Sequence, residues 1–269
     1  MIYAAIVVYN KKCTDSVTIQ CLQKWTNRKT LHVVVFDNST SDFGNEEFCT
    51  KNEYSYLTYH ENKGLSFAYN RIIESLNADS NDYLLILDDD TELTEAYLAE
   101  ILYCEKSEIN LPIVRSKIDG HIFSPSVMKS TVRSIAIESA AELEGKRITA
   151  INSGMVIKAS VFHTIKYNEN LFLDYVDHDF MEQANDNDFR IKILNTPIVQ
   201  NISRQNITNS SSARHRLEIY GKDYKRYCFK HRKRMYYYAS FLKTTIIYCM
   251  QAKTVSFIPI FIRCIYKSN

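Results

Sequence analysis

Glycine and proline are scarce in this sequence of 269 residues, which holds 6 Gly and 4 Pro. This scarcity argues against linker-rich or low-complexity segments. No period of about 20 to 50 residues repeats, which excludes solenoid and propeller architectures. No glycine-rich loop follows the first apolar run, where Tyr9-Asn10-Lys11-Lys12 stands instead. Its absence argues against dinucleotide oxidoreductases and nucleotidyltransferases, whose phosphate loops need glycine.

Cysteine is present without a recognisable pattern. The 7 cysteines form no C-x-x-C pair and are odd in number, so they fit neither a zinc site nor a disulfide framework. We therefore expect a reducing, cytoplasmic setting.

The composition is that of a globular protein, but its charge is unevenly distributed. With 45% hydrophobic and 24% charged residues, intrinsic disorder and collagen-like structure are excluded. Counted along the sequence, residues 1–212 hold 20 Lys and Arg against 29 Asp and Glu, whereas residues 213–269 hold 13 against 2. We expect one α/β domain over 1–212 with a basic, aromatic helical tail over 213–269. A polyanionic surface, either a membrane leaflet or nucleic acid, would be the partner of this tail.

Apolar runs alternate with helical patterns in the first part of the chain. Strands are predicted over 2–8, 31–36, 54–59 and 83–87, and helices over 16–25, 65–76 and 94–104. This alternation predicts a doubly wound, mostly parallel sheet flanked by helices, with ligands at the carboxyl ends of its strands. Further along, we expect short strands over 111–114 and 121–123, a strand over 148–157 that is interrupted by Asn152-Ser153-Gly154, and one or two strands over 191–199 broken by Pro197. We also expect a helix over 175–184 and a long helical region from 213 that is interrupted near Pro259.

Three aspartates follow the strand predicted over 83–87. Side chains two apart on a strand share a face, so Asp88 and Asp90 are predicted to enter one cleft while Asp89 points elsewhere. Two carboxylates together suit Mg²⁺ or Mn²⁺ bound with substrate phosphates. The alternative is a solvated acidic turn in which Asp90 caps the next helix.

Several motifs resemble the family 2 glycosyltransferases, which have the GT-A fold. They are Tyr9-Asn10, Asp37-Asn38-Ser39, Glu61-Asn62-Lys63-Gly64-Leu65 with Asn70, and Asp88-Asp89-Asp90-Thr91. The later segments Ile151-Asn152-Ser153-Gly154 and Phe172-Leu173-Asp174-Tyr175-Val176-Asp177-His178-Asp179-Phe180 are similar to the bacterial rhamnosyltransferase branch of that family. The resemblance implies a nucleotide-sugar half over 1–110 and an acceptor half over 111–212.

The resemblance also implies residues that bind a nucleoside diphosphate sugar. Asp37 would accept a hydrogen bond from N3–H of a uracil or thymine ring, with Tyr9 and Asn10 beside the base and ribose. Asp88 and Asp89 would also lie at the donor.

A second group of residues would bind the diphosphate. Asn62-Lys63-Gly64 precedes a helix, where backbone N–H groups, a lysine and a glycine suit a diphosphate, and Asn70 follows on that helix. The alternatives are a solvent-exposed loop lysine at Lys63 and a satisfied helix-face amide at Asn70.

The catalytic base is expected among the acids that follow Leu171. The family's glutamate-aspartate pair falls on Val176-Asp177, so Asp177 matches the base, while Val176 departs from the pattern. Asp174 and Asp179 are therefore competitors for this role. The alternative is that these acids only cap or solvate the helix that begins near Asp177.

Many relatives carry a metal-binding histidine after the closing strand, and this sequence has none at that place. Gln200 or Asn201 would substitute as an oxygen ligand, or the metal relies on Asp90 and phosphates. The nearest downstream histidine is His215.

These observations predict an inverting, metal-dependent glycosyltransferase. The resemblance favours rhamnose from dTDP-rhamnose as the transferred sugar and a hydroxyl of a glycan or lipid-linked glycan as the acceptor, in bacterial surface-polysaccharide assembly. The alternatives are another UDP- or dTDP-sugar and a non-catalytic nucleotide-sugar or carbohydrate binder.

The tail is predicted to lie on the inner face of the plasma membrane without crossing it. Its apolar stretch over 241–265 is interrupted by Lys243, Gln251, Lys253, Pro259 and Arg263 before about 20 apolar residues are reached. Cations and tyrosines before this stretch suit an interfacial element, which favours the membrane over nucleic acid. The alternative is that these helices pack on the catalytic domain or on a second subunit.

Overall fold

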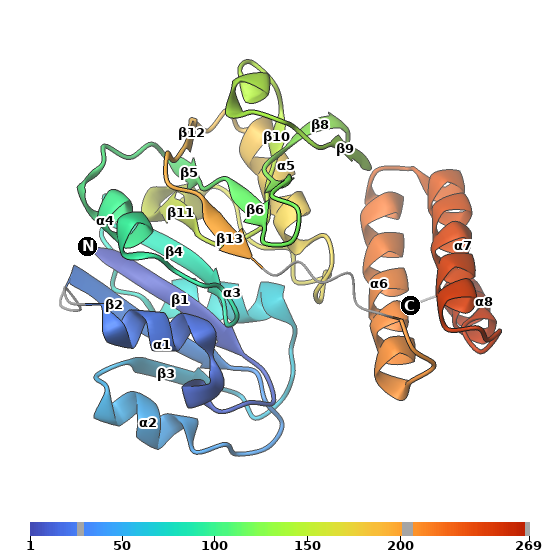
Figure 1. Cartoon of the computed structure of the whole chain (residues 1–269), viewed down its shortest axis with the longest axis horizontal. Coiled ribbons are helices and arrows are strands. Elements are labelled where there is room, and N and C mark those ends of the chain that lie inside the picture. Colours follow the sequence, from blue (N-terminus) through green and yellow to red (C-terminus); the bar gives the residue numbers. More distant parts are fainter. Residues whose placement is uncertain (26–29, 201–206, 267–269) are drawn as a thin grey trace.

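A seven-stranded sheet forms the centre of the protein (Figure 1). The computed structural model describes residues 1–25, 30–200 and 207–266. The strands of the sheet are β1 (Ile2–Val8), β2 (Leu31–Asp37), β3 (Ser55–Thr58), β4 (Tyr83–Asp88), β5 (Ile109–Leu111), β11 (Met155–Lys158) and β12 (Ile191–Ile193). Their order is β12-β5-β11-β4-β1-β2-β3, and only β11 runs antiparallel to its neighbours. The predicted mostly parallel sheet is confirmed.

Helices cover both faces of this sheet. Alternate residues of β1 enter different hydrophobic clusters, with Ala5 and Val7 in one and Ala4 and Ile6 in the other. Because both faces are buried, these strands read as continuous apolar runs. The first cluster is completed by α3 (Leu65–Ser75) and α5 (Val176–Asp186), and the second by α1 (Val17–Lys24), α2 (Asn45–Lys51) and α4 (Glu95–Tyr103).

Two small sheets, β10-β8-β9 and β13-β6-β7, extend the second half of the chain. Their strands are β6 (Val114–Ser116), β7 (Ile122–Ser124), β8 (Ser126–Ser130), β9 (Arg133–Ile135), β10 (Ile148–Thr149) and β13 (Ile198–Gln200). Short 3₁₀ helices lie at η1 (Cys13–Asp15), η3 (Ala140–Leu143) and η4 (Ala159–His163).

Three of the strands predicted after residue 110 are each divided between two sheets. Pro112 separates β5 from β6, and Pro197 lies between β12 and β13. The turn at Asn152-Ser153-Gly154 separates β10 from β11, and Gly154 has a φ of +79°. The sequence pattern does not predict α2, β8 or β9, because these elements are short and polar.

The predicted helical tail is a unit of three helices, α6 (Ser211–Lys230), α7 (Arg234–Gln251) and α8 (Ile258–Tyr266). They share a hydrophobic cluster of their own. Figure 1 shows α6 next to the sheet domain, with α7 and α8 on its outer side. The predicted interruption near Pro259 is confirmed, because residues 252–257 separate α7 from α8. Pro259 itself is the second residue of α8, where its missing N–H is not needed. Within the described ranges, we find no helix with the length and apolarity to span a membrane.

Helix α6 is packed firmly on the sheet domain. The ring of Tyr175 stacks on those of Tyr224 and Tyr227, with centroids 5.0 and 4.9 Å apart. The Lys230 ammonium lies 2.7 Å from the buried Asp179 carboxylate. One alternative for the tail was that its helices pack on the catalytic domain, and these contacts show that α6 does so.

Candidate active site

Three carboxylates lie where β4 ends, on the wall of a pocket of about 1090 Å³. The turn that carries them is held by the start of α1. The Ser16 hydroxyl donates to the carbonyl oxygen of Asp89 at 2.7 Å, and the Thr18 hydroxyl donates to the carbonyl oxygen of Asp88. This backbone support fixes the direction in which the three side chains leave the strand.

The three carboxylates have different surroundings. The Asp89 carboxylate lies 2.6 Å from the Lys11 ammonium. Asp88 and Asp90 also line a second cavity of about 480 Å³, which Asp89 does not line. The alternative role of Asp90 as a helix cap does not hold, because the hydroxyl of Thr94 caps α4. A ligand at the place where the two cavities meet can therefore contact both Asp88 and Asp90.

Asp88 is the most enclosed of the three. Its carboxylate accepts a hydrogen bond from the Ser153 hydroxyl in the turn before β11. Burial, together with the charges of Asp90 and Asp89, raises the pKa of Asp88 to about 6. A cation beside this carboxylate would favour its ionised form.

A second wall of the large pocket comes from the carboxyl ends of β1 and β2 and the loop before α3. Tyr9, Asn38, Asn62 and Gly64 line it. The Asn38 side chain accepts from the Lys63 N–H at 2.9 Å and so holds the loop in place. Gly64 has a φ of +86°, and a Cβ there would lie 2.6 Å from the carbonyl oxygen of Phe172. Only glycine fits at this position, because the left-handed backbone and the close contact both exclude a side chain.

We predicted that Asp37 contacts the base, but Asp37 is not among the described residues that line this wall. Its buried carboxylate accepts hydrogen bonds from the Ser39 N–H at 3.0 Å, the Asn45 amide at 2.7 Å and the Tyr56 hydroxyl at 3.1 Å. Asn45 and Tyr56 gave no signal in the sequence. Asp37 therefore organises the end of β2, and three of the roughly four acceptor positions of its carboxylate are used by protein donors.

Three more predicted donor-binding residues are not among the residues that line the pocket. The Lys63 ammonium pairs with Glu61 at 2.7 Å, which matches the loop-lysine alternative. The buried Asn70 amide donates to the Tyr167 carbonyl oxygen at 2.9 Å, which matches the satisfied-amide alternative. Asn10 is exposed, and its N–H donates to the Ser39 hydroxyl at 2.7 Å.

Asp177 lies in the second cavity, together with Asp88, Asp90 and Gln200. One of its carboxylate oxygens accepts from the His178 N–H at 2.8 Å. Burial, with a contribution from the Asp88 charge, raises the pKa of Asp177 to about 6. The Gln200 amide donates to the Thr91 hydroxyl at 3.0 Å, and Asn201 lies outside the described residues. Asp177 can therefore accept a proton from a hydroxyl in this cavity at neutral pH.

The two competing acids are engaged in ion pairs. Both oxygens of Asp174 accept from the Arg216 guanidinium. Asp179 is buried, pairs with Lys230 and accepts from the Gln183 amide at 2.9 Å. Neither acid is among the described residues that line the two cavities. Through these ion pairs, Asp174 links the loop before α5 to α6, and Asp179 links α5 to α6.

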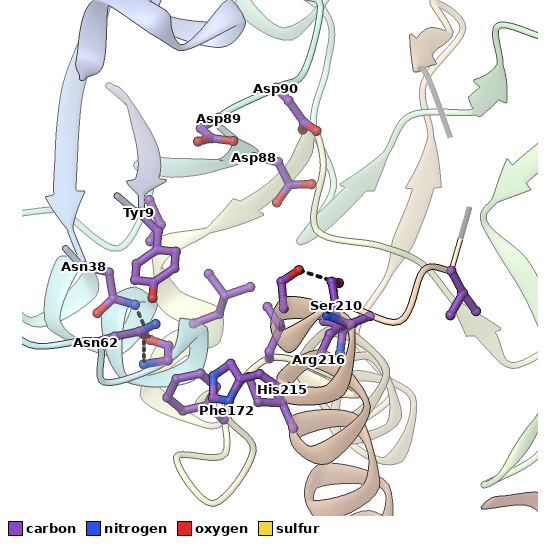
Figure 2. A pocket seen from close by; sticks show the side chains of 18 of the residues that line it. Tyr9, Asn38, Asn62, Asp88, Asp89, Asp90, Phe172, Ser210, His215 and Arg216 are labelled. Atoms are coloured by element: carbon purple, nitrogen blue, oxygen red, sulfur yellow. Dashed lines mark hydrogen bonds between the residues drawn. The ribbon is translucent and has the colours of Figure 1, made fainter. Parts of the chain in front are cut away.

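Helix α6 supplies a wall that the sequence analysis placed outside the catalytic domain. His215, Arg216 and Ile219 of α6 line the large pocket. Figure 2 shows His215 and Arg216 on the side of the pocket opposite the three carboxylates. The only sequence signal was the change to basic composition after residue 212, which does not reveal where the helix packs.

Asp223 on α6 holds the loop that leads to Asp177. Its buried carboxylate accepts from the N–H groups of Phe172, Leu173 and Asp174 at 3.0, 2.8 and 3.0 Å. A carboxylate that receives three backbone donors fixes the course of the chain between them. Asp223 is thus a positioning residue for the candidate site.

We expect Asp223→Ala to lower the free energy of unfolding by about 3 kcal/mol, because three partly buried N–H groups lose a charged acceptor. Urea denaturation measures this change. Glu218→Ala is the matched control, since Glu218 lies on the same helix and its ion pairs among the described residues are with the half-exposed Lys222 and Arg263. Its cost should stay below about 1 kcal/mol. Equal costs for the two variants would contradict the positioning role.

The donor set fits a divalent metal that binds together with substrate. Asp88 and Asp90 offer hard carboxylate oxygens on the wall of the large pocket. In the described part of the chain, no group of three His, Cys, Asp or Glu side chains is arranged to hold a metal. Mg²⁺ is commonly held by one or two carboxylates with substrate phosphates and water, and this site matches that pattern.

No protein-family model and no curated protein matches the sequence. The structure is similar to that of GalNAc-T7, solved with UDP, GalNAc and Mn²⁺, with a TM-score of 0.63, 13% identity and coverage of 99% of this chain and 56% of that one. This chain therefore spans only about half of the GalNAc-T7 chain.

Two further solved structures are similar over nearly the whole chain. One is the mannosyltransferase PcManGT from Pyrobaculum calidifontis, in complex with GDP-Man and Mn²⁺, with a TM-score of 0.53 and 10% identity. This match covers 98% of the present chain and 85% of the PcManGT chain. The other is S. aureus TarS, with a TM-score of 0.51 and 15% identity, and this match covers 99% of the present chain and 81% of the TarS chain. These likenesses, with the sheet order described above, show that the chain has the GT-A fold.

Proposed function

We propose that this protein is an inverting, metal-dependent glycosyltransferase that moves a sugar from a nucleoside diphosphate to a hydroxyl group. The observation that carries the proposal is the position of Asp88 and Asp90 on the wall shared by two cavities, with Asp177 in the smaller one. The larger cavity has room for a nucleoside diphosphate sugar, and the smaller one gives an acceptor access to Asp177. Neighbours of the same fold are described with UDP or GDP-Man and Mn²⁺, which supports this assignment.

The proposed reaction is a direct displacement. The acceptor oxygen bonds to the anomeric carbon, the bond between that carbon and the diphosphate oxygen breaks, and the acceptor proton passes to the Asp177 carboxylate. A Mg²⁺ or Mn²⁺ ion held by Asp88 and Asp90 would stabilise the negative charge of the departing diphosphate. Arg216, on the opposite wall, is placed to orient the donor.

The finer assignment is rhamnose from dTDP-rhamnose, transferred to a glycan or lipid-linked glycan at the inner face of the plasma membrane. It depends on the similarity of the Asn152-Ser153-Gly154 turn and the 172–180 segment to bacterial rhamnosyltransferases. The contacts of both segments with the site support it, since Ser153 contacts Asp88 and the second segment carries Asp177. Other UDP- or dTDP-sugars are the second choice of donor, because uracil and thymine present the same N3–H group and the base does not separate these donors.

The experiment is a donor screen. The protein is incubated with a panel of dTDP-, UDP- and GDP-sugars and Mn²⁺, and the release of nucleoside diphosphate is measured by mass spectrometry. We expect release from dTDP-rhamnose above the other donors, and none after chelation with EDTA. Saturation-transfer NMR on the same panel separates binding from turnover. Binding without release under every condition would identify a non-catalytic nucleotide-sugar binder and overturn the proposal.

A further inference from the structure

The outer helices α7 and α8 expose apolar side chains that no described part of the chain covers. Tyr237, Phe241 and Phe257 are fully buried in the cluster shared by the three helices, so the exposed set lies on the opposite faces. Met235 is 80% exposed and Met250 71%. We call this set the outer face; it consists of Met235, Tyr236, Leu242, Ile246, Ile247 and Met250 on α7 and Ile258, Ile262 and Tyr266 on α8.

An apolar patch of this kind on a helical unit indicates a binding surface. On α7, the residues Met235, Leu242, Ile246 and Met250 recur at spacings of seven and four, which places them on one stripe of the helix. On α8, Ile258 and Ile262 are one turn apart, and Tyr266 follows another turn later. The stripes run along both helices on the side away from their own core.

The charge around the outer face has a single sign. The sequence from residue 224 to residue 269 contains no aspartate or glutamate. Exposed cations stand along the outer face and in the turns at its ends: Arg232, Lys233, Arg234, Lys243 and Lys253. Such a surface repels cations and attracts an anionic partner that also offers apolar material.

A cavity of about 480 Å³ lies at the turn between α6 and α7, at one end of the outer face. Arg232, Lys233 and Arg234 line it together with Phe229, Met235 and Tyr236. Arg234 lies over the Phe229 ring at 5.1 Å, which orients its guanidinium. Among the described residues, no carboxylate forms a salt bridge with Arg232, Lys233 or Arg234. Three cations without acidic partners around a cavity match a phosphate group.

We propose that the outer face docks on an anionic lipid bilayer and that the cavity at its end binds a lipid headgroup phosphate. The Met, Ile and Leu side chains would enter the boundary between headgroups and acyl chains, with Tyr236 and Tyr266 at the interface. Nucleic acid fits less well, because its backbone would meet the cations and leave the apolar stripes in water. This surface specifies the membrane placement proposed above and does not depend on the transfer chemistry.

The test is flotation of the full chain with vesicles of phosphatidylcholine alone or mixed with phosphatidylglycerol. We expect binding to the mixed vesicles, weakening as salt is raised, and little binding to phosphatidylcholine alone. Ile246→Asp with Met250→Asp places charges in the apolar stripe, and Arg232→Gln with Lys233→Gln empties the cavity of two cations. Each pair should lower the partition coefficient at least about tenfold.

The matched control is Lys129→Gln with Lys146→Gln, which removes the same charge from exposed positions on the sheet domain. It should bind vesicles like the unchanged protein, and circular dichroism checks that every variant is folded. Equal loss in the control, or no binding of the unchanged protein, overturns the proposal. Release of the protein from vesicles by inorganic phosphate alone also overturns the proposal, because it would identify a site for free phosphate.

Two other occupants give different results. If a second copy covers the outer face, light scattering will show a dimer that the Ile246→Asp, Met250→Asp variant dissociates while vesicle binding stays unchanged. If nucleic acid is the partner, an oligonucleotide will bind at physiological salt and the aspartate substitutions will have no effect on it. Either result contradicts the proposal. Nucleoside diphosphate release measured without vesicles separates a failure of this surface from a failure of the proposed transfer activity.

Discussion

Asp90→Ala is expected to lower kcat/KM by about 10³-fold or more and to weaken donor binding in Mg²⁺ or Mn²⁺. The physical reason is that this carboxylate would tie the metal to the diphosphate, and the metal contributes several kcal/mol of charge stabilisation in the transition state. Among the described residues, no cation forms an ion pair with the Asp90 carboxylate, and Asp90 lines both cavities. Initial rates over a range of donor concentrations, with donor binding by calorimetry, measure the two effects.

Asp89→Ala is the matched control, one residue away in the same turn. The Asp89 carboxylate is paired with Lys11 and does not line the smaller cavity, so its loss should be much milder. EDTA should remove the activity of the unchanged protein, and added Mn²⁺ should restore it. An equal loss in the two variants, or full activity in EDTA, would show that the metal has been assigned wrongly.

The sheet could be predicted because its strands are buried on both faces. Ile2–Val8 and Tyr83–Asp88 enter two different cores with alternate residues, so each appears in the sequence as an unbroken apolar run. Helices α1, α3 and α4 carry the 3.6-residue apolar spacing of helices that lie on a sheet. The short polar helix α2 lacks that spacing and was missed.

The strand ends could be predicted as the location of the site, but the partners of each side chain could not. Asp37 and Asn70 have the right residue types, yet Asn45, Tyr56 and Tyr167 satisfy them from elsewhere in the fold. Hydrogen bonds between residues as much as 97 positions apart leave no periodic pattern in one sequence.

The contribution of α6 was hidden for a related reason. Its basic composition indicates a negatively charged partner, and the structure shows one in the acids Asp174 and Asp179. Those two acids, which compete with Asp177 for the role of base, pair with Arg216 and Lys230 and so fasten α6 beside the pocket. The packing of the tail therefore supports the proposal that Asp177 is the base.

Asp177→Asn is expected to lower kcat by about 10² to 10⁴ while donor binding stays nearly unchanged. The amide keeps the shape of the side chain but cannot take the acceptor proton, and a general base contributes an effect of this size. Single-turnover rates measure the chemical step, and calorimetry measures donor affinity. Asp179→Asn is the control, because Asp179 pairs with Lys230 and should affect stability more than kcat.

The pH profile gives the same hypothesis a second test. Because burial raises the pKa of Asp177 to about 6, the carboxylate is ionised above that pH and protonated below it. The rate of the unchanged protein should therefore be level above pH 7 and fall about tenfold for each pH unit well below 6. In Asp177→Asn this inflection should disappear, whereas Asp174→Asn should keep it and raise KM, because it releases Arg216. If the inflection survives in Asp177→Asn and is lost in Asp174→Asn or Asp179→Asn, the base is one of those two acids.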